Sequence, residues 1–432
     1  MTLPTTAHSG PCLGVGDVDR ARALAASIAV DLADPPPSAT DEDCAPASAR
    51  WHHQSLSKGA PGIALLHALR PSTARREESV HRWLRHATAG GLSIGHGAGL
   101  WFGAPAIAFA VTIASPQRYP DARATLDRTV AALTRARLDA AWARMLAAAR
   151  PPLSEFDVVR GLTGLGAYLL RAAPDRPLLR DVLRYLVALT RPLPAHDAAS
   201  PDAPGWWAAD PPPGNPADLG GHANLGMAHG IAGPLALLAL ALRAGIDVPG
   251  QVDAIDRISD WLDTWRQPAP AGPWWPERIT VADLRSGQPT QPGPARPSWC
   301  YGTPGLARAQ QLAAIVRGDR NWQAAAEHAL TACLTDPHQL TRLTDLSVCH
   351  GWAGVALTAW FVAADATTSG PAATLPGLTR AFLDHAVNPD PPSGRPARGL
   401  INGLAGAALV AELLAAPTTT GPPPWPSCLL LN

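Results

Sequence analysis

A short glycine turn occurs seven times along the chain, and each copy leads into an apolar run. The copies lie at 58–68, 102–111, 160–170, 229–240, 301–312, 350–360 and 402–414. Six of them have the pattern Gly-x-x-Gly, and the second has Ala106 in the last position. The first glycines of successive copies are 44 to 72 residues apart. A repeat of this length predicts an array of similar structural units.

The segments between the turns carry charged residues on one face and apolar residues at helical spacing. This pattern predicts amphipathic helices at 17–33, 75–90, 121–149, 175–190, 251–266, 320–334 and 374–387. The segments that follow the turns are apolar on nearly all sides, which is typical of buried helices. We therefore expect an all-α fold, an α/α toroid with seven apolar helices inside a ring of seven amphipathic ones.

The composition supports one large core. Of the 432 residues, 47% are hydrophobic and only 16% are charged. Each helix pair of such an array can bury its apolar face only against its neighbours, so the ring must close as a unit. We expect a single domain over 1–432, with flexible termini at 1–16 and 416–432.

The charge balance excludes some classes of partner. Lys and Arg total 35, as do Asp and Glu, so the formal net charge is zero. No basic field is present to attract nucleic acid, and no polybasic run to attract a membrane surface. The N-terminus lacks a signal-peptide pattern, and the longest apolar run, 230–242, is too short for a transmembrane segment. We expect a cytoplasmic protein whose cysteines stay reduced.

Two connections are too long to be simple linkers. They span 191–226 and 267–299, are rich in proline, and carry the tryptophan pairs Trp206–Trp207 and Trp274–Trp275. Each leads into an inner helix whose turn carries chemically active side chains. We interpret both as loops that border a depression at the end of the ring where the inner helices begin.

Two of the six cysteines lie just before glycine turns. Cys300 directly precedes the fifth turn, and Cys349 with His350 precedes the sixth. Because these turns belong to adjacent inner helices, the three side chains can converge. Two thiolates and an imidazole are a ligand set for zinc, with a fourth position left open for water or substrate. The alternative is that these cysteines are small buried hydrophobes, the interpretation we give to Cys333 in an outer helix.

Other polar residues fall at the same end of the ring. His229 occupies in turn four the place that Tyr301 and His350 have in turns five and six. Asp157 lies four residues before turn three, and Arg296 four residues before the cysteine of turn five. Singly, they could be a core histidine, a capping aspartate and a surface arginine. Together they would supply an acid/base group, a carboxylate to orient it and a cation.

The stretches NLGMAHGIAG, RPSWCYGTPG, CHGWAG and DVVRGLTG resemble the motifs of the lanthipeptide cyclase family, the LanC-like proteins. The resemblance covers nearly the whole chain, because the seven glycine turns and the WWP of 274–276 also fit. It implies a sevenfold α/α toroid with one Zn²⁺ ion, held by Cys300, Cys349 and His350. By the same matching of positions it implies a proton donor or acceptor and three active-site neighbours, namely His229 with Asp157, Arg296 and Tyr301.

The resemblance also implies a reaction and partners. A cysteine thiol of a dehydrated precursor peptide would add to a dehydroalanine or dehydrobutyrine of the same peptide, forming a lanthionine or methyllanthionine thioether. A leader on that peptide, a dehydratase, an exporter and a membrane-associated biosynthetic complex are the implied partners. Some family members carry a small inserted domain between early helices. Here the intervals 71–101 and 116–157 are expected to be filled by outer helices, which leaves no room for it.

Rival classes of protein explain fewer of these residues. A glycosidase needs two facing carboxylates, and Glu155 is the one candidate partner for Asp157. A glycosidase would also leave the cysteines without a role. A zinc-dependent prenyltransferase needs a basic cluster for a diphosphate, for which Arg296 alone is thin support. A LanC-like protein that adds a small thiol such as glutathione, or one whose zinc is only structural, stays open. The complete zinc and acid/base sets favour an active cyclase.

Overall fold

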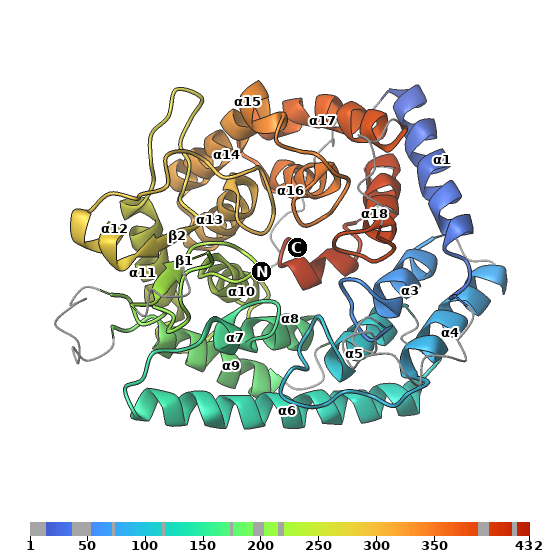
Figure 1. Cartoon of the computed structure of the whole chain (residues 1–432), viewed down its shortest axis with the longest axis horizontal. Helices are drawn as coiled ribbons and strands as arrows, with labels where there is room; N and C mark the ends of the chain where they lie inside the picture. Colours follow the sequence, from blue (N-terminus) through green and yellow to red (C-terminus); the bar gives the residue numbers. More distant parts are fainter. Residues whose placement is uncertain are drawn as a thin grey trace.

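The helices form a double ring in the computed structural model (Figure 1). It describes residues 14–36, 53–70, 74–114, 117–172, 176–192, 203–214, 220–387, 397–416 and 421–432. The outer ring within these residues consists of α1 (Val15–Asp31), α4 (Ala74–Thr88), α6 (Pro120–Leu146), α9 (Arg176–Leu189), α11 (Gln251–Thr264), α14 (Arg320–Thr335) and α17 (Gly370–Val387). The inner ring consists of α3 (Ala60–Ala68), α5 (Ala104–Ala114), α8 (Leu162–Ala172), α10 (Ala232–Arg243), α13 (Thr303–Arg317), α16 (Trp352–Asp365) and α18 (Leu404–Ala415). The predicted α/α toroid is confirmed.

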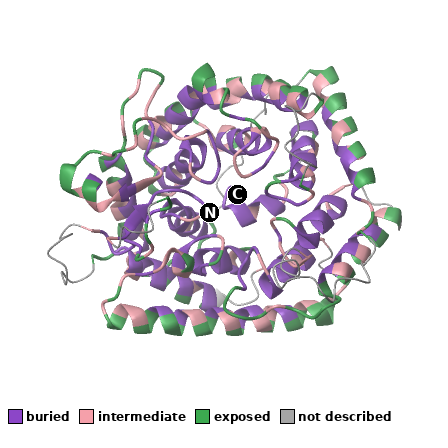
Figure 2. Ribbon diagram, in the orientation of Figure 1, coloured by how far each residue is buried: buried purple, intermediate pink, exposed green. Residues whose placement is uncertain are grey.

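The two rings differ in burial as their sequence patterns predict. Every residue of α3 is buried, as are the first ten residues of α10. Along α6 the buried positions recur at helical spacing on one face, which packs inward, and the other face meets solvent; they are Leu126, Val130, Ala131, Thr134, Leu138 and Ala141. Figure 2 shows this contrast around the whole molecule. Each inner helix contacts the next one, and α18 contacts α3, which closes the ring.

Backbone hydrogen bonds join neighbouring glycine turns at the start of the inner helices. They run from Leu56 N to Trp101 O, Val158 N to Ala228 O, Ala228 N to Cys300 O, Trp299 N to Cys349 O, Val348 N to Ile401 O and Ile401 N to Ser57 O, at 2.8 to 3.2 Å. Between turns two and three the Arg137 guanidinium of α6 makes the connection, because it donates to the carbonyls of Ala98 and Arg160. The turns therefore form a hydrogen-bonded circle.

The two long connections pair with each other. Their strands β1 (His222–Asn224) and β2 (Arg278–Thr280) are antiparallel, with Ala223 opposite Ile279. The short helix α12 (Val281–Ser286) follows β2 directly. Segments of both connections also line a cavity of about 970 Å³, which none of the predicted site residues borders.

The tryptophans of these connections anchor them to the outer ring. All four indoles of the two pairs are buried. The Trp206 ring packs edge-on against Trp261 of α11, and Trp275 Nε1 donates to the Leu262 carbonyl of α11 at 3.0 Å. Trp207 Nε1 donates to the Gly220 carbonyl of its own connection at 2.9 Å. Both connections are thus held in place directly before turns four and five. The parts of the first connection at 193–202 and 215–219 lie outside the described residues.

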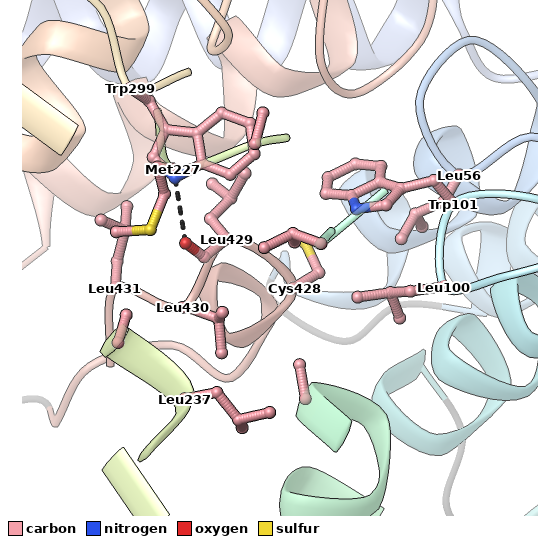
Figure 3. Packing of buried hydrophobic residues seen from close by; sticks show 14 of the residues in the cluster. Leu56, Leu100, Trp101, Met227, Leu237, Trp299, Cys428, Leu429, Leu430 and Leu431 are labelled. Carbon is pink, nitrogen blue, oxygen red and sulfur yellow. Dashed lines mark hydrogen bonds between the residues drawn. The ribbon is translucent and has the colours of Figure 1, made fainter. Parts of the chain in front are cut away.

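Residues 421–432, which the sequence predicts to be part of a flexible C-terminus, pack against the ring in the structure. The 3₁₀ helix η2 (Trp425–Leu429) and the leucines that follow it are buried near the middle of the ring (Figures 1 and 3). Trp299 Nε1 donates to the Leu429 carbonyl at 2.9 Å, and Arg308 Nε donates to the Leu431 carbonyl at 3.0 Å. The physical reason is the apolar run WPSCLLL, whose burial outweighs the cost of ordering a proline-rich tail.

The remaining predictions about the ends of the chain and about membranes have simple outcomes. The predicted flexible segment 1–16 lies outside the described residues up to position 13, and α1 already begins at Val15. Among the helices that the structure describes, none has the length and apolar character needed to cross a membrane.

Candidate functional site

The three predicted metal ligands lie together at turns five and six. Cys300 is three residues before α13 begins, and His350 is two residues before α16 begins. The ligand atoms of Cys300, Cys349 and His350 all lie within 4.8 Å of one another. Cys300 N–H donates to the Cys349 carbonyl at 3.4 Å, so the backbone itself holds the two turns in register. The structure therefore brings these side chains within metal-binding distance.

The electrostatics of this cluster suit a divalent cation. Hydrogen bonding from Cys349 holds the pKa of Cys300 well below its ordinary value, against the effect of burial. The same contact raises the pKa of Cys349. A second thiolate beside the first is disfavoured, because two adjacent negative charges repel each other at close range. A dication would allow both to ionise, and two thiolates with one imidazole are the soft donor set that Zn²⁺ favours.

A second cluster joins turns three and four. His229 Nδ1 lies 2.6 Å from Asp157 Oδ2, and the Asp157 side chain is only 2% exposed. Asp157 Oδ1 accepts the backbone N–H groups of Arg160 at 2.6 Å and Gly161 at 2.7 Å. Because an ionised carboxylate can only accept, the proton of a neutral His229 ring belongs on Nδ1. This leaves Nε2 of His229, whose side chain is 34% exposed, free to exchange a proton.

The position four residues before the first glycine is a capping position in several turns. Ser55, Ser298 and Ser347 occupy it in turns one, five and six, and their hydroxyl oxygens accept turn amides from Lys58, Gly302 and His350 at 2.8 to 3.2 Å. Asp157 occupies the same position in turn three. Asp157 therefore caps turn three with Oδ1 and contacts His229 with Oδ2.

Tyr301 lies beside His229. The two rings are 6.1 Å apart between centroids and inclined by 30°. Burial raises the pKa of Tyr301 to about 12, although its hydrogen bond with Asn224 acts in the opposite direction. The phenol is therefore protonated at neutral pH and able to donate a hydrogen bond.

Arg296 lies on the side of the cysteines. Its Nη1 is 3.9 Å from Oδ2 of Asp345, and its side chain is 35% exposed. The same carboxylate oxygen lies 3.6 Å from Nε2 of His350. The predicted cation is thus connected to the metal-ligand cluster through Asp345.

Sequence reasoning missed Asp345 and Asn224. Asp345 precedes turn six by a few residues, much as Asp157 precedes turn three, and this similarity was the available signal. Asn224 ends β1, where its Oδ1 accepts the N–H of Gly226 at 3.0 Å. Its role depends on the pairing of the two long connections, which no local pattern indicates.

Glu155 does not supply the second carboxylate that a glycosidase would need. Glu155, in the short helix α7 (Leu153–Phe156), accepts a hydrogen bond from Arg144 of α6 at 2.6 Å and another from Tyr185 of α9 at 2.7 Å. These partners belong to the outer ring, so Glu155 ties the two rings together instead of facing Asp157.

Comparisons with known proteins agree with this geometry. The chain aligns with a solved structure of nisin cyclase at a TM-score of 0.72 and 18% identity, over 96% of this chain and 97% of that one. That likeness concerns the fold, an α/α toroid. Among curated protein sequences, none is significantly similar to this chain. The profile of the family described as "Lanthionine synthetase C-like protein" matches residues 50–430. On that match, which spans most of the sequence, the chain belongs to the lanthionine synthetase C-like family.

Proposed function

We propose that this protein is a zinc-dependent peptide cyclase that forms lanthionine or methyllanthionine rings. The observation that carries the proposal is the placement of Cys300, Cys349 and His350 within 4.8 Å of one another, one turn away from His229 and the buried Asp157. Family membership and the shared fold with nisin cyclase support the same reaction class. The whole chain would act as one domain, since the helices that carry these turns belong to one closed ring.

Zn²⁺ is the expected cofactor, with Cys300, Cys349 and His350 as its ligands. When bound, it would supply an open coordination position and lower the pKa of a substrate thiol, which is otherwise mostly protonated at neutral pH. The turns would hold the two thiols and the imidazole in place through the backbone bond between Cys300 and Cys349.

The reaction would be an addition across a carbon–carbon double bond. The peptide sulfur forms a bond to the β-carbon of a dehydroalanine or dehydrobutyrine, and the thiol proton is released. The electron pair of the double bond moves to the α-carbon and its carbonyl as an enolate, which then takes up one proton. The product has the same atoms as the reactant, so the net change is an isomerisation.

His229 would deliver the proton to the α-carbon as a general acid. Asp157 would hold the ring in one orientation, because the buried carboxylate lies 2.6 Å from Nδ1. Arg296 would stabilise negative charge on the enolate oxygen, and Tyr301 would donate a hydrogen bond to the substrate. A dehydrated precursor peptide with its leader is the proposed substrate, supplied by a dehydratase in a cytoplasmic or membrane-associated complex that also includes an exporter.

The first test needs no natural substrate. Metal analysis of the wild type is expected to give about one zinc ion per chain. Cys300→Ala and Cys349→Ala are expected to lose it, whereas Cys333→Ala is the matched control, since that buried thiol lies in α14 of the outer ring and hydrogen-bonds to Gln339. Zinc that is absent from the wild type, or retained in both site variants, would contradict the proposed metal centre.

The second test measures the reaction. A short synthetic peptide with one dehydroalanine and one cysteine is expected to lose its alkylatable thiol without any change in mass. His229→Ala is expected to keep its zinc and to form no correct rings. Glutathione added to the same assay distinguishes the alternative activity, since intermolecular addition raises the mass of the peptide. A mass increase without ring formation would overturn the cyclase assignment in favour of thiol addition.

A further inference from the structure

Asp345 lies between His350 and Arg296 of the candidate site. Its Oδ2 is 3.6 Å from Nε2 of His350 and 3.9 Å from Nη1 of Arg296. It is not one of the three side chains of the possible metal-ligand cluster, which are Cys300, Cys349 and His350.

The position of Asp345 is built into turn six. Its Oδ1 accepts the backbone N–H of Ser347 at 2.7 Å, and its own carbonyl accepts the N–H of Trp352 at 3.0 Å. A Cβ atom at Gly351 would collide with both of these Asp345 oxygens. The first glycine of the turn therefore keeps open the space that the aspartate occupies, and the carboxylate is fixed before any substrate or metal arrives.

This placement determines which ring nitrogen of His350 is available to a metal. Nε2 lies 3.6 Å from the carboxylate, and an N–H at Nε2 that donated to it would leave Nδ1 as the nitrogen for a metal. Histidine ligands of metals almost always donate their other N–H to a carboxylate, a carbonyl or water, and this contact sets the tautomer and the orientation of the ring. Asp345 has the chemistry and the position for that contact.

We propose that Asp345 is a positioning residue that orients His350 for metal binding. The inference rests on the proposed zinc centre and deepens it, because it assigns to this chain a fourth residue that determines metal affinity without touching the metal. The competing explanation is that Asp345 serves only Arg296, as its partner in a half-exposed ion pair.

Zinc affinity separates the two explanations. In Asp345→Asn, Oδ1 can still accept the Ser347 amide, but the negative charge that faces His350 is lost. The matched control is Asp336→Asn, which changes another partly buried aspartate of the same connection, where the side chain caps α15 (Pro337–Leu340) through the N–H of His338 at 3.0 Å. Competition with a chromogenic chelator would give the zinc dissociation constant of each full-length protein.

The expected result is a zinc affinity about 10- to 100-fold weaker for Asp345→Asn than for the wild type. Asp336→Asn is expected to match the wild type. The thermal midpoint of the metal-free protein supplies a second readout, because a purely structural aspartate would lower the midpoint and leave the affinity of the folded fraction unchanged. Cobalt-loaded protein supplies a third, since a reoriented imidazole alters the visible absorption bands of the ion.

An unchanged zinc affinity with an unchanged cobalt spectrum would overturn the inference, whatever happens to cyclisation. A wild type that binds no zinc would instead refute the proposed metal centre itself. The two failures are therefore distinguishable in one set of titrations.

Discussion

Two aspartate–histidine pairs lie on neighbouring parts of the same circle of turns, and they are built in the same way. In each, one carboxylate oxygen accepts backbone amides of its own turn and the other faces an imidazole. They differ in closeness and burial. Asp157 is 2% exposed and 2.6 Å from His229, whereas Asp345 is 40% exposed and 3.6 Å from His350.

The difference follows from what each histidine is proposed to do. A proton donor must hold one tautomer and one orientation without help from other charges, so a close and buried carboxylate is required. A metal ligand is also held by the ion and by the other ligands, here two thiols. A more distant and more solvated carboxylate is then sufficient to set its orientation.

Breaking the tight pair, Asp157 with His229, is expected to have the largest effect. Asp157→Ser would place in turn three the same capping residue that Ser298 and Ser347 provide in turns five and six. The hydroxyl can replace Oδ1 as the amide acceptor, but nothing replaces Oδ2. We expect the cyclisation rate to fall about 10²- to 10⁴-fold, as when a general acid loses its orienting carboxylate. Thiol loss from the dehydroalanine peptide measures this rate.

Asp157→Ala is the companion variant, because it removes both oxygens. It should show the same loss of rate together with a lower free energy of unfolding, by about 1 kcal/mol for the missing cap. Zinc content should stay at the wild-type level in both variants. Full activity in Asp157→Ser would mean that the aspartate is a cap and nothing more.

A second prediction concerns the support behind the tight pair. Turn three is held to turn two by Arg137, which donates to three backbone carbonyls, including that of His96 at 2.8 Å. Arg137→Ala leaves these acceptors without their charged donor. We expect the free energy of unfolding to fall by about 2–3 kcal/mol. Urea denaturation of the two proteins measures the difference.

Arg128→Ala on the same helix is the control for this change. Its exposed guanidinium contacts only Thr125 one turn away among the hydrogen bonds of the described residues, so the effect should stay within about 0.5 kcal/mol. If Arg137→Ala is equally mild, backbone packing alone must hold turns two and three together.

Sequence reasoning was effective where a pattern repeats. The fourteen helices of the two rings follow from apolar periodicity and from glycine turns, and their observed bounds differ from the expected ones by a few residues. At Gly305 the reason for the glycine is now clear, because a Cβ there would collide with the Trp299 carbonyl of the same turn. The ligand cluster and the His229–Asp157 contact were foreseen for the same reason, since they stand at fixed positions relative to these turns.

Features that depend on distant parts of the chain could not be foreseen. The C-terminal leucines resemble a loose tail until the ring offers Trp299 and Arg308 as partners. Arg137 looks like one more charge on an amphipathic helix, and only the closed ring places it against two turns. Pairing of β1 with β2 likewise brings together residues from connections that are separated by α10 and α11.

The smallest predicted effect concerns Tyr301, which lies beside the tight pair. Its titration tests whether water reaches this part of the site. Burial raises its pKa to about 12 in the folded protein, against about 10 in an unfolded chain. The folded state therefore favours the protonated phenol. This contribution to stability is complete below pH 10, and it is lost as the pH rises from about 10 to about 12.

Tyr301→Phe removes the titrating hydroxyl group and leaves every charged side chain in place. The difference in free energy of unfolding between wild type and variant should be constant up to pH 10 and should then shrink by about 1 kcal/mol, because the ring is partly exposed. Denaturant titrations at several alkaline pH values, on metal-free samples of both proteins, measure that slope. A difference that stays flat to pH 12 would mean that water reaches the phenol, so that the burial of Asp157 does not extend to Tyr301.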